Sequence, residues 1–188
     1  MKTLKNVLQL CVIFVVLQWS SKVEAQSFIT DNGSAVFTST APLLEFKGTS
    51  EHLNGLINFS ENLVDFYLDL NTLDTGIDLR NRHMRESYLE TAKFPFAEFT
   101  GKIESNPDFS RNEPQQIVVI GSFKLHGVQK QITVQGTITP HADGTISINA
   151  EWEVLLEDYK IKRPRVVFYE LSDTQTITID TKLNPHSP

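Results

Sequence analysis

The sequence contains almost no cysteine. Its single cysteine, Cys11, lies in the apolar N-terminal run, so a chain cleaved after residue 25 would have none. Such a chain can form no disulfide and can carry out no thiolate chemistry. Its stability must therefore come from a hydrophobic core, and 188 residues with 40% hydrophobic content are enough for one domain to build one.

The sequence also lacks the usual catalytic and metal-binding motifs. GxSxG, P-loop and GxGxxG patterns do not occur, and the histidines form no HxH or HExxH pair. Carboxylates that could form a glycosidase-like pair, such as Asp65, Asp69 and Glu98, alternate outward on expected strands, which is typical of solvated faces. We therefore expect no metal site, no cofactor and no catalytic residue.

The N-terminus carries the only long apolar run. Lys2 and Lys5 precede an apolar stretch from Val7 to Trp19, and a polar segment then leads to Ala25. This pattern is typical of a secretory signal, and the run is short of the roughly 20 residues that span a bilayer. We expect residues 1–25 to be a signal peptide cleaved after Ala25, and residues 26–188 to be a single periplasmic or secreted domain without a membrane-spanning segment.

The charge balance excludes one class of partner. Removal of residues 1–25 would leave 14 basic and 22 acidic residues, a net charge of −8. A surface of that sign repels nucleic acid and anionic lipid head groups, so we expect no nucleic-acid partner. Homodimer formation is left open by the sequence.

Alternation of apolar and polar residues with a period of two dominates the chain. Val64, Phe66, Leu68 and Leu70 share one face of an expected strand, and residues 115–125, 130–140 and 145–156 alternate in the same way. We expect further strands over 35–40, 43–52, 55–58, 96–104 and 174–183. Only residues 76–91 show loosely helical spacing. About eight antiparallel strands with one helical insertion predict an all-β barrel or sandwich.

Small residues interrupt the apolar faces of three consecutive strands. Gly121, Gly136 and Ala150 each stand between large apolar residues on the face expected to point inward. If these positions align across the sheet, they leave a hollow strip inside a barrel. The glycines could equally serve to bend strands so that a barrel closes. Either interpretation makes an apolar cavity plausible.

The segment from Asp74 to Phe99 concentrates charge and aromatic residues. Arg80, His83 and Arg85 follow the turn residues Asp74-Thr75-Gly76, and Phe94, Phe96 and Phe99 come soon after. Three interpretations remain open: a tie between the helical insertion and strand ends, a polar contact to a ligand head group, and acid–base catalysis by His83. No nucleophile lies near His83 in the sequence.

Two motifs in these regions resemble those of the YceI-like family. The first runs through Asp74-Thr75-Gly76, Arg80, His83-Met84-Arg85 and Lys93-Phe94-Pro95. The second is GSFKLHGVQK, from Gly121 to Lys130. The resemblance implies a lipocalin-like eight-stranded antiparallel β-barrel that encloses a polyisoprenoid or another long amphiphile, and no known reaction. The sequence departs from the family pattern over residues 155–172, which leaves ligand length and head-group preference open.

The leading hypothesis is therefore non-catalytic binding of a long amphiphilic lipid. We expect the ligand to contact the apolar residues Phe66, Leu68, Met84, Phe94, Phe96, Phe99, Val119, Phe123, Val134 and Trp152. We also expect His83 to contact the ligand, and Arg80 and Arg85 to form a polar clasp near one end. The alternatives are an enzyme that uses His83 on a hydrophobic substrate, and a structural or partner-binding protein with a filled core.

Overall fold

The structure is a computed structural model that describes residues 27–41, 44–162 and 172–186. The expected signal peptide, residues 1–25, lies outside the described residues. Residues 163–171, the central part of the segment that departs from the family pattern, also lie outside the described residues.

Eight strands form the body of the molecule, and short helical segments join some of them. The strands are β1 (Ser27–Ala41), β2 (Leu44–Asn58), β3 (Leu63–Asp69), β4 (Phe96–Ile103), β5 (Gln115–Leu125), β6 (Val128–Pro140), β7 (Ile146–Leu155) and β8 (Thr174–His186). The helical segments are η1 (Leu70–Thr72), α2 (Asp78–His83), η2 (Met84–Tyr88) and η3 (Leu156–Tyr159).

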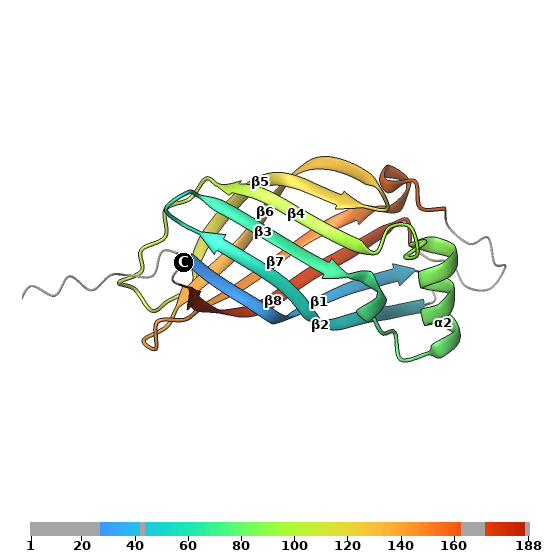
Figure 1. Cartoon of the computed structure of the whole chain (residues 1–188), viewed down its shortest axis with the longest axis horizontal. Helices are drawn as coiled ribbons and strands as arrows, with labels where there is room; N and C mark the ends of the chain where they lie inside the picture. The colour runs from blue at the N-terminus through green and yellow to red at the C-terminus, as the bar shows by residue number, and fades with distance from the viewer. Residues whose placement is uncertain (1–26, 42–43, 163–171, 187–188) are drawn as a thin grey trace, which may run out of the picture.

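The strands close into a barrel. Each strand pairs antiparallel with the next, and β8 pairs antiparallel with β1 from Ser27↔His186 to Ser39↔Gln175 (Figure 1). This arrangement confirms the predicted eight-stranded antiparallel barrel with a short helical insertion, and it excludes the sandwich. Closure pairs every strand on both sides, so the sheet has no free edge.

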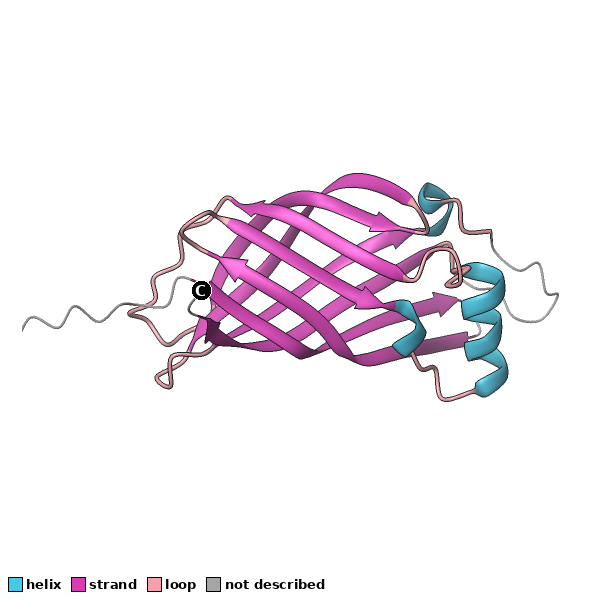
Figure 2. Ribbon diagram, viewed as in Figure 1, coloured by secondary structure: helices cyan, strands magenta, loops and turns pink. Residues whose placement is uncertain are grey.

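The two ends of the barrel differ. The connections β2–β3, β4–β5 and β6–β7 lie at one end, which we call the closed end. The other end carries the insertion, residues 70–95 between β3 and β4, together with η3 and the β5–β6 hairpin. Figure 2 shows the helical segments gathered at this second end, which we call the open end.

The alternation expected from the sequence is present on the strands. On β5, Ile117, Val119, Phe123 and Leu125 are buried, while Ile120 and Lys124 between them are exposed. The β5–β6 hairpin turns through His126 and Gly127, both with positive φ (51° and 72°), the geometry of a two-residue hairpin loop. Apolar side chains from all eight strands therefore point into the barrel.

Some strands are longer than the sequence predicted, among them β1, which was expected over 35–40 and runs from Ser27 to Ala41. The expected strands 43–52 and 55–58 form the single strand β2, which runs through Gly55 without a break. Gly55 pairs with Phe66 of β3, and the Phe66 ring occupies the space that a side chain at position 55 would fill. The ring covers the glycine backbone and keeps it in the ladder, so no turn forms there.

The predicted strip of three small residues is only partly correct. Gly136 and Ala150 are directly paired between β6 and β7, but Gly121 pairs with Ile132 and with Gly101. A Cβ atom at Gly121 would lie 2.7 Å from the Gly101 Cα and 2.8 Å from the Phe99 ring. Gly121 therefore lets two strands and a phenylalanine approach closely, and it does not extend the hollow beside Ala150.

This close approach predicts that Gly121→Ala destabilises the protein. The added methyl group would meet the Thr100 carbonyl oxygen at 2.6 Å, a backbone atom that cannot move aside cheaply. We expect a loss of about 1–3 kcal/mol in the free energy of unfolding, measured by urea denaturation. Ile120→Ala, on the exposed side of the same strand, serves as the control and should change it by less than about 0.5 kcal/mol. Equal effects of the two substitutions would contradict this account.

Candidate functional site

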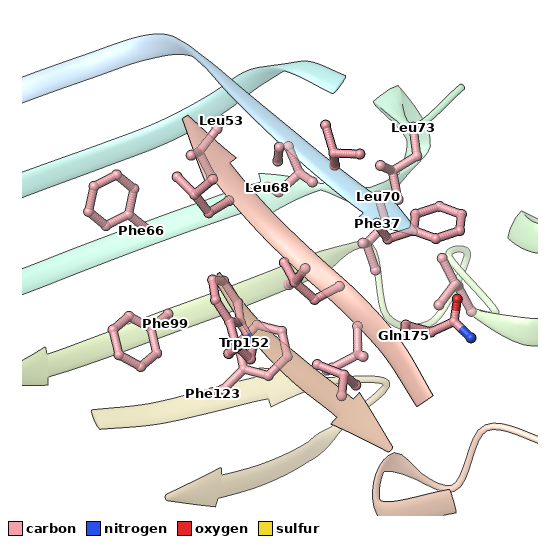
Figure 3. Close-up of a pocket in the computed structure, with 18 of the residues that line it drawn as sticks. Phe37, Leu53, Phe66, Leu68, Leu70, Leu73, Phe99, Phe123, Trp152 and Gln175 are labelled. Atoms are coloured by element: carbon pink, nitrogen blue, oxygen red, sulfur yellow. The ribbon is translucent and has the colours of Figure 1, made fainter. Parts of the chain in front are cut away.

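A large cavity occupies the barrel interior. Its volume is about 750 Å³, within the usual range of small-molecule sites. Side chains from β1 to β8 and from the insertion line it (Figure 3). Figure 3 shows Phe66, Phe99, Phe123 and Trp152 around one stretch of the cavity and Phe37, Leu70 and Leu73 around another.

Packed side chains fill the closed end. The rings of Phe28, Phe59 and Phe109 contact one another with centroids 4.8–6.0 Å apart. Ile138 and Leu183 are fully buried in the same cluster. These side chains form a solid floor, so the cavity does not continue through the barrel.

The opposite end of the cavity reaches solvent. Five cavity-lining residues surround it there, and we call them the rim: Phe46, Ile77, Leu79, Arg80 and His83. Ile77 is 49% exposed and Leu79 is 52% exposed although both line the cavity. The Arg80 guanidinium carbon lies 4.5 Å from the centre of the Phe46 ring, a cation–π distance. Apolar and cationic groups thus meet at the entrance.

The walls between floor and rim are almost entirely apolar. Gln175 is a buried polar residue of the wall, and its amide nitrogen donates to the carbonyl oxygens of Ser172 (2.8 Å) and Thr174 (3.3 Å). Glu98 also borders the cavity, but its carboxylate pairs with Lys124, 3.0 Å away, on the exposed side of the wall. Such walls suit a hydrocarbon chain, because a buried charge without a partner would be costly.

Hydrogen bonds hold the start of the insertion against the barrel. The Asn81 side-chain oxygen accepts from the Thr75 amide (2.8 Å) and hydroxyl (2.7 Å), and its amide nitrogen donates to Asp74 (2.7 Å). The Asp74 backbone pairs with Thr49 of β2. The Asn81 and Gly76 bonds hold the pKa of the Asp74 carboxyl below its usual value. The Asp74-Thr75-Gly76 motif is therefore a structural turn.

A second set of contacts holds the end of the insertion. The His126 ring places Nδ1 2.9 Å from the Tyr159 carbonyl oxygen of η3 and Nε2 2.9 Å from the Glu90 carboxylate. The Phe94 ring packs edge-on against the His126 ring, with centroids 4.8 Å apart. We call His126, Glu90 and Tyr159 the latch, because they join the hairpin, the insertion and η3 at the open end.

The Tyr159 partner of the latch fixes the hydrogen on one imidazole nitrogen. A carbonyl oxygen only accepts, so Nδ1 must carry a hydrogen towards Tyr159. The His126 hydrogen bond, with Lys93 nearby, lowers the pKa of the Glu90 carboxyl.

The structure brings together most of the residues predicted for the site. Eight apolar residues of that set line the cavity: Phe66, Leu68, Met84, Phe99, Val119, Phe123, Val134 and Trp152. Arg80 and His83 stand at the rim. The His83 side chain is exposed and takes part in no hydrogen bond with the rest of the described chain.

Three residues of the predicted set lie away from the cavity. Phe96 is 41% exposed and packs on Tyr67 outside the barrel, because positions 96 and 99 of one strand face opposite sides. Phe94 packs on the His126 ring. Arg85 points back and donates to the Leu73 carbonyl oxygen, 2.9 Å away, so it joins two parts of the insertion and is no part of a clasp with Arg80.

The cavity also includes residues that the sequence did not single out. Phe37 and Phe46 come from β1 and β2, Leu70 and Leu73 from the insertion, and Leu156 from η3. Ile177 and Ile179 of β8 line it as well. The alternation at Ile177 and Ile179 was visible in the sequence, but no pattern could show that the insertion folds back over the same end.

Two further findings concern the described residues alone. Within 27–41, 44–162 and 172–186, no three histidine, cysteine or acidic side chains gather in a geometry that could hold a metal ion. In the same ranges, no helix has the length and apolar content needed to cross a membrane.

Comparison with known proteins agrees with the barrel. The profile of the YceI-like domain matches residues 23–183. The chain belongs to the YceI-like family. This result confirms the resemblance drawn from the two sequence motifs.

Curated relatives match a shorter part of the chain. The UPF0312 proteins of Yersinia pestis (strain Pestoides F) and Yersinia pseudotuberculosis (serotype O:1b) are each 29% identical over 111 residues, which is 55% of this chain and 54% of theirs. The chain therefore spans about half the length of the curated relatives it matches.

Solved structures share the fold at low identity. A polyisoprenoid binding domain from Saccharophagus degradans, implicated in plant cell wall breakdown, superposes with a TM-score of 0.74 at 20% identity and covers 86% of this chain and 99% of its own. Burkholderia cenocepacia BcnA (TM-score 0.64, 12% identity, 81% and 96% coverage) and the Campylobacter jejuni YCEI protein (0.63, 18%, 79% and 90%) are similar. The YceI-like chain has the barrel of these proteins.

The latch predicts a specific acid sensitivity. The folded-state pKa of Glu90 lies below its ordinary value of 4.5, so Glu90 adds stability above that value and loses it as the pH falls through the lowered pKa. The melting temperature of wild type should be higher than that of Glu90→Gln near neutral pH, and this difference in melting temperature should become smaller in acid. Thermal unfolding followed from about pH 7 to about pH 3 measures it.

A double-mutant cycle provides the control for the latch. In a His126→Gln background, Glu90→Gln should have a smaller effect, because the hydrogen bond from His126 is the main cause of the lowered pKa. Two results would contradict the latch. In the first, the difference in melting temperature between wild type and Glu90→Gln stays constant as the pH falls. In the second, Glu90→Gln has the same effect in the His126→Gln background as in wild type.

Proposed function

We propose that this YceI-like protein binds a long apolar or amphiphilic molecule, such as a polyisoprenoid or another lipid, and carries or stores it without chemical change. One observation carries the proposal: a cavity of about 750 Å³ with apolar walls, solid at one end and open at the other. The description of the Saccharophagus degradans domain as polyisoprenoid binding supports it.

The apolar walls provide enough free energy for binding. Each buried methylene contributes about 0.8 kcal/mol, so ten of them give roughly 8 kcal/mol before ordering costs are subtracted. Hydrocarbon contact discriminates poorly between chains of similar width. Affinity would therefore come from the tail, and orientation from polar groups at the rim.

The rim favours an outward-facing head group. Among the described residues, Arg80 and His83 are basic side chains at the cavity entrance, and Arg80 is held over the Phe46 ring. A chain that enters tail-first would place its apolar end against the aromatic floor and its head beside Arg80. We also propose that the protein acts in the periplasm or outside the cell after cleavage at Ala25, which the intact mass of protein purified from its native source would test.

Native extraction tests the proposal directly. Protein purified without detergent and extracted with organic solvent should yield about one long-chain lipid per chain by mass spectrometry. Added geranylgeraniol should raise the melting temperature of protein emptied of lipid, because a ligand that binds the folded state stabilises it. Protein that yields no stoichiometric lipid and does not respond to any long-chain alcohol would contradict the proposal.

A cavity-filling variant locates the ligand. Ala150 lines the cavity beside Gly136, so Ala150→Phe should place a ring where the chain lies and weaken geranylgeraniol binding by at least about tenfold. Asn149→Phe adds the same ring on the exposed side of β7 and is the matched control. The melting-temperature shift measures both variants. Equal binding by Ala150→Phe and wild type would show that the chain does not occupy this part of the barrel.

A further inference from the structure

The rim exposes two aliphatic side chains at the mouth of the cavity. Ile77 and Leu79 are about half exposed, and both also line the cavity. Single exposed aliphatic residues are common on protein surfaces. These two differ because they continue the apolar lining of the cavity out to the molecular surface, so an apolar path leads from the interior to solvent.

The local fold does not require apolar residues at these positions. The insertion is fixed through Asn81 and Met84, which are buried, and through the Asp74 turn. Ile77 precedes α2 without contributing a side-chain cap, and the space beside Gly76 is open. Polar residues at positions 77 and 79 would satisfy the same fold, so the exposed apolar surface points to a contact outside the chain.

The distribution of charge distinguishes the two ends of the barrel. Nine of the twelve basic residues in the described ranges lie at or near the open end: Lys47, Arg80, Arg82, Arg85, Lys93, Lys124, Lys130, Lys160 and Lys162. That end also carries eleven acidic residues and so has a net charge of −2, and the rest of the described chain, with three basic and ten acidic residues, has a net charge of −7. Because the open end is net acidic as a whole, attraction to an anionic surface must come from the rim itself, where α2 carries Arg80 and Arg82 against one carboxylate, Asp78.

Unpaired cations stand close to the exposed aliphatic residues. Within the part of the chain that the structure describes, Arg82 is exposed and makes no ion pair or hydrogen bond, and the contact of the Arg80 guanidinium is the Phe46 ring. Aliphatic side chains flanked by arginines suit the boundary between lipid head groups and acyl chains, where both kinds of group find partners.

We propose that the rim docks on the surface of an anionic lipid bilayer. Ile77 and Leu79 enter the head-group layer, and Arg80 and Arg82 contact lipid phosphates. The mouth of the cavity then faces the apolar layer, so an amphiphile passes between bilayer and barrel without crossing water. This inference rests on the proposed function, because it assigns the route by which the ligand enters. The small apolar area makes the contact transient.

Vesicle binding tests the docking surface. Wild type should co-float with vesicles of mixed phosphatidylglycerol and phosphatidylethanolamine, more weakly at high salt and more weakly with pure phosphatidylcholine. The double substitution Ile77→Ser with Leu79→Ser should weaken binding about tenfold. Arg80→Gln with Arg82→Gln should weaken binding to the anionic vesicles and have little effect on phosphatidylcholine.

A matched control and a second variant separate this proposal from the proposed function. Ile120→Ser removes an equally exposed aliphatic residue (47%) from the outer wall and should leave vesicle binding unchanged. Ala150→Phe should still dock although it no longer takes up geranylgeraniol. The docking surface is overturned if vesicle binding survives both double substitutions at the rim. It is also overturned if Ile120→Ser weakens vesicle binding as much as they do. Neither result would contradict ligand binding in the barrel. Wild type that floats with no vesicle and instead binds a second protein through Ile77 and Leu79 also overturns it.

Discussion

Pairing of the eighth strand with the first is the constraint on which the rest of the structure depends. It runs from Ser27↔His186 to Ser39↔Gln175 and leaves no strand edge exposed. An eight-stranded barrel is just wide enough either to be filled by its own side chains or to hold one small ligand. This chain combines both outcomes along one axis: Phe28, Phe59 and Phe109 fill the closed end, and the half beneath the insertion encloses the cavity.

The contrast between the two ends explains how a rigid barrel can admit a ligand. The floor belongs to a densely packed cluster, and its rings cannot move aside without breaking that cluster. The open end is instead assembled from short segments fixed by a few polar contacts, chiefly Asn81 to Asp74, Arg85 to Leu73 and the His126 latch. Segments held by few contacts open at low free-energy cost, so motion that admits a ligand would arise there.

Much of the fold was predictable from the sequence, because strand alternation is a local signal. The inward faces of β3, β5, β6, β7 and β8 follow from period-two patterns, and the two motifs identify the family. The side of the sheet that each residue faces was predictable as well, because Phe96 and Phe99 are three positions apart on one strand and must face opposite sides. Strand register was not, so Gly121 was placed beside Gly136 although it pairs with Gly101. The latch joins residues 36 positions apart and left no signal in the chain.

The central claim is that the space between the aromatic floor and the rim holds a long apolar chain. Solvent extraction of detergent-free protein, with mass spectrometry of the extract, measures this most directly. The account predicts about one long-chain lipid per wild-type chain and little or none for Ala150→Phe purified in the same way. Wild-type protein that carries no lipid, or Ala150→Phe protein that carries as much as wild type, would contradict it.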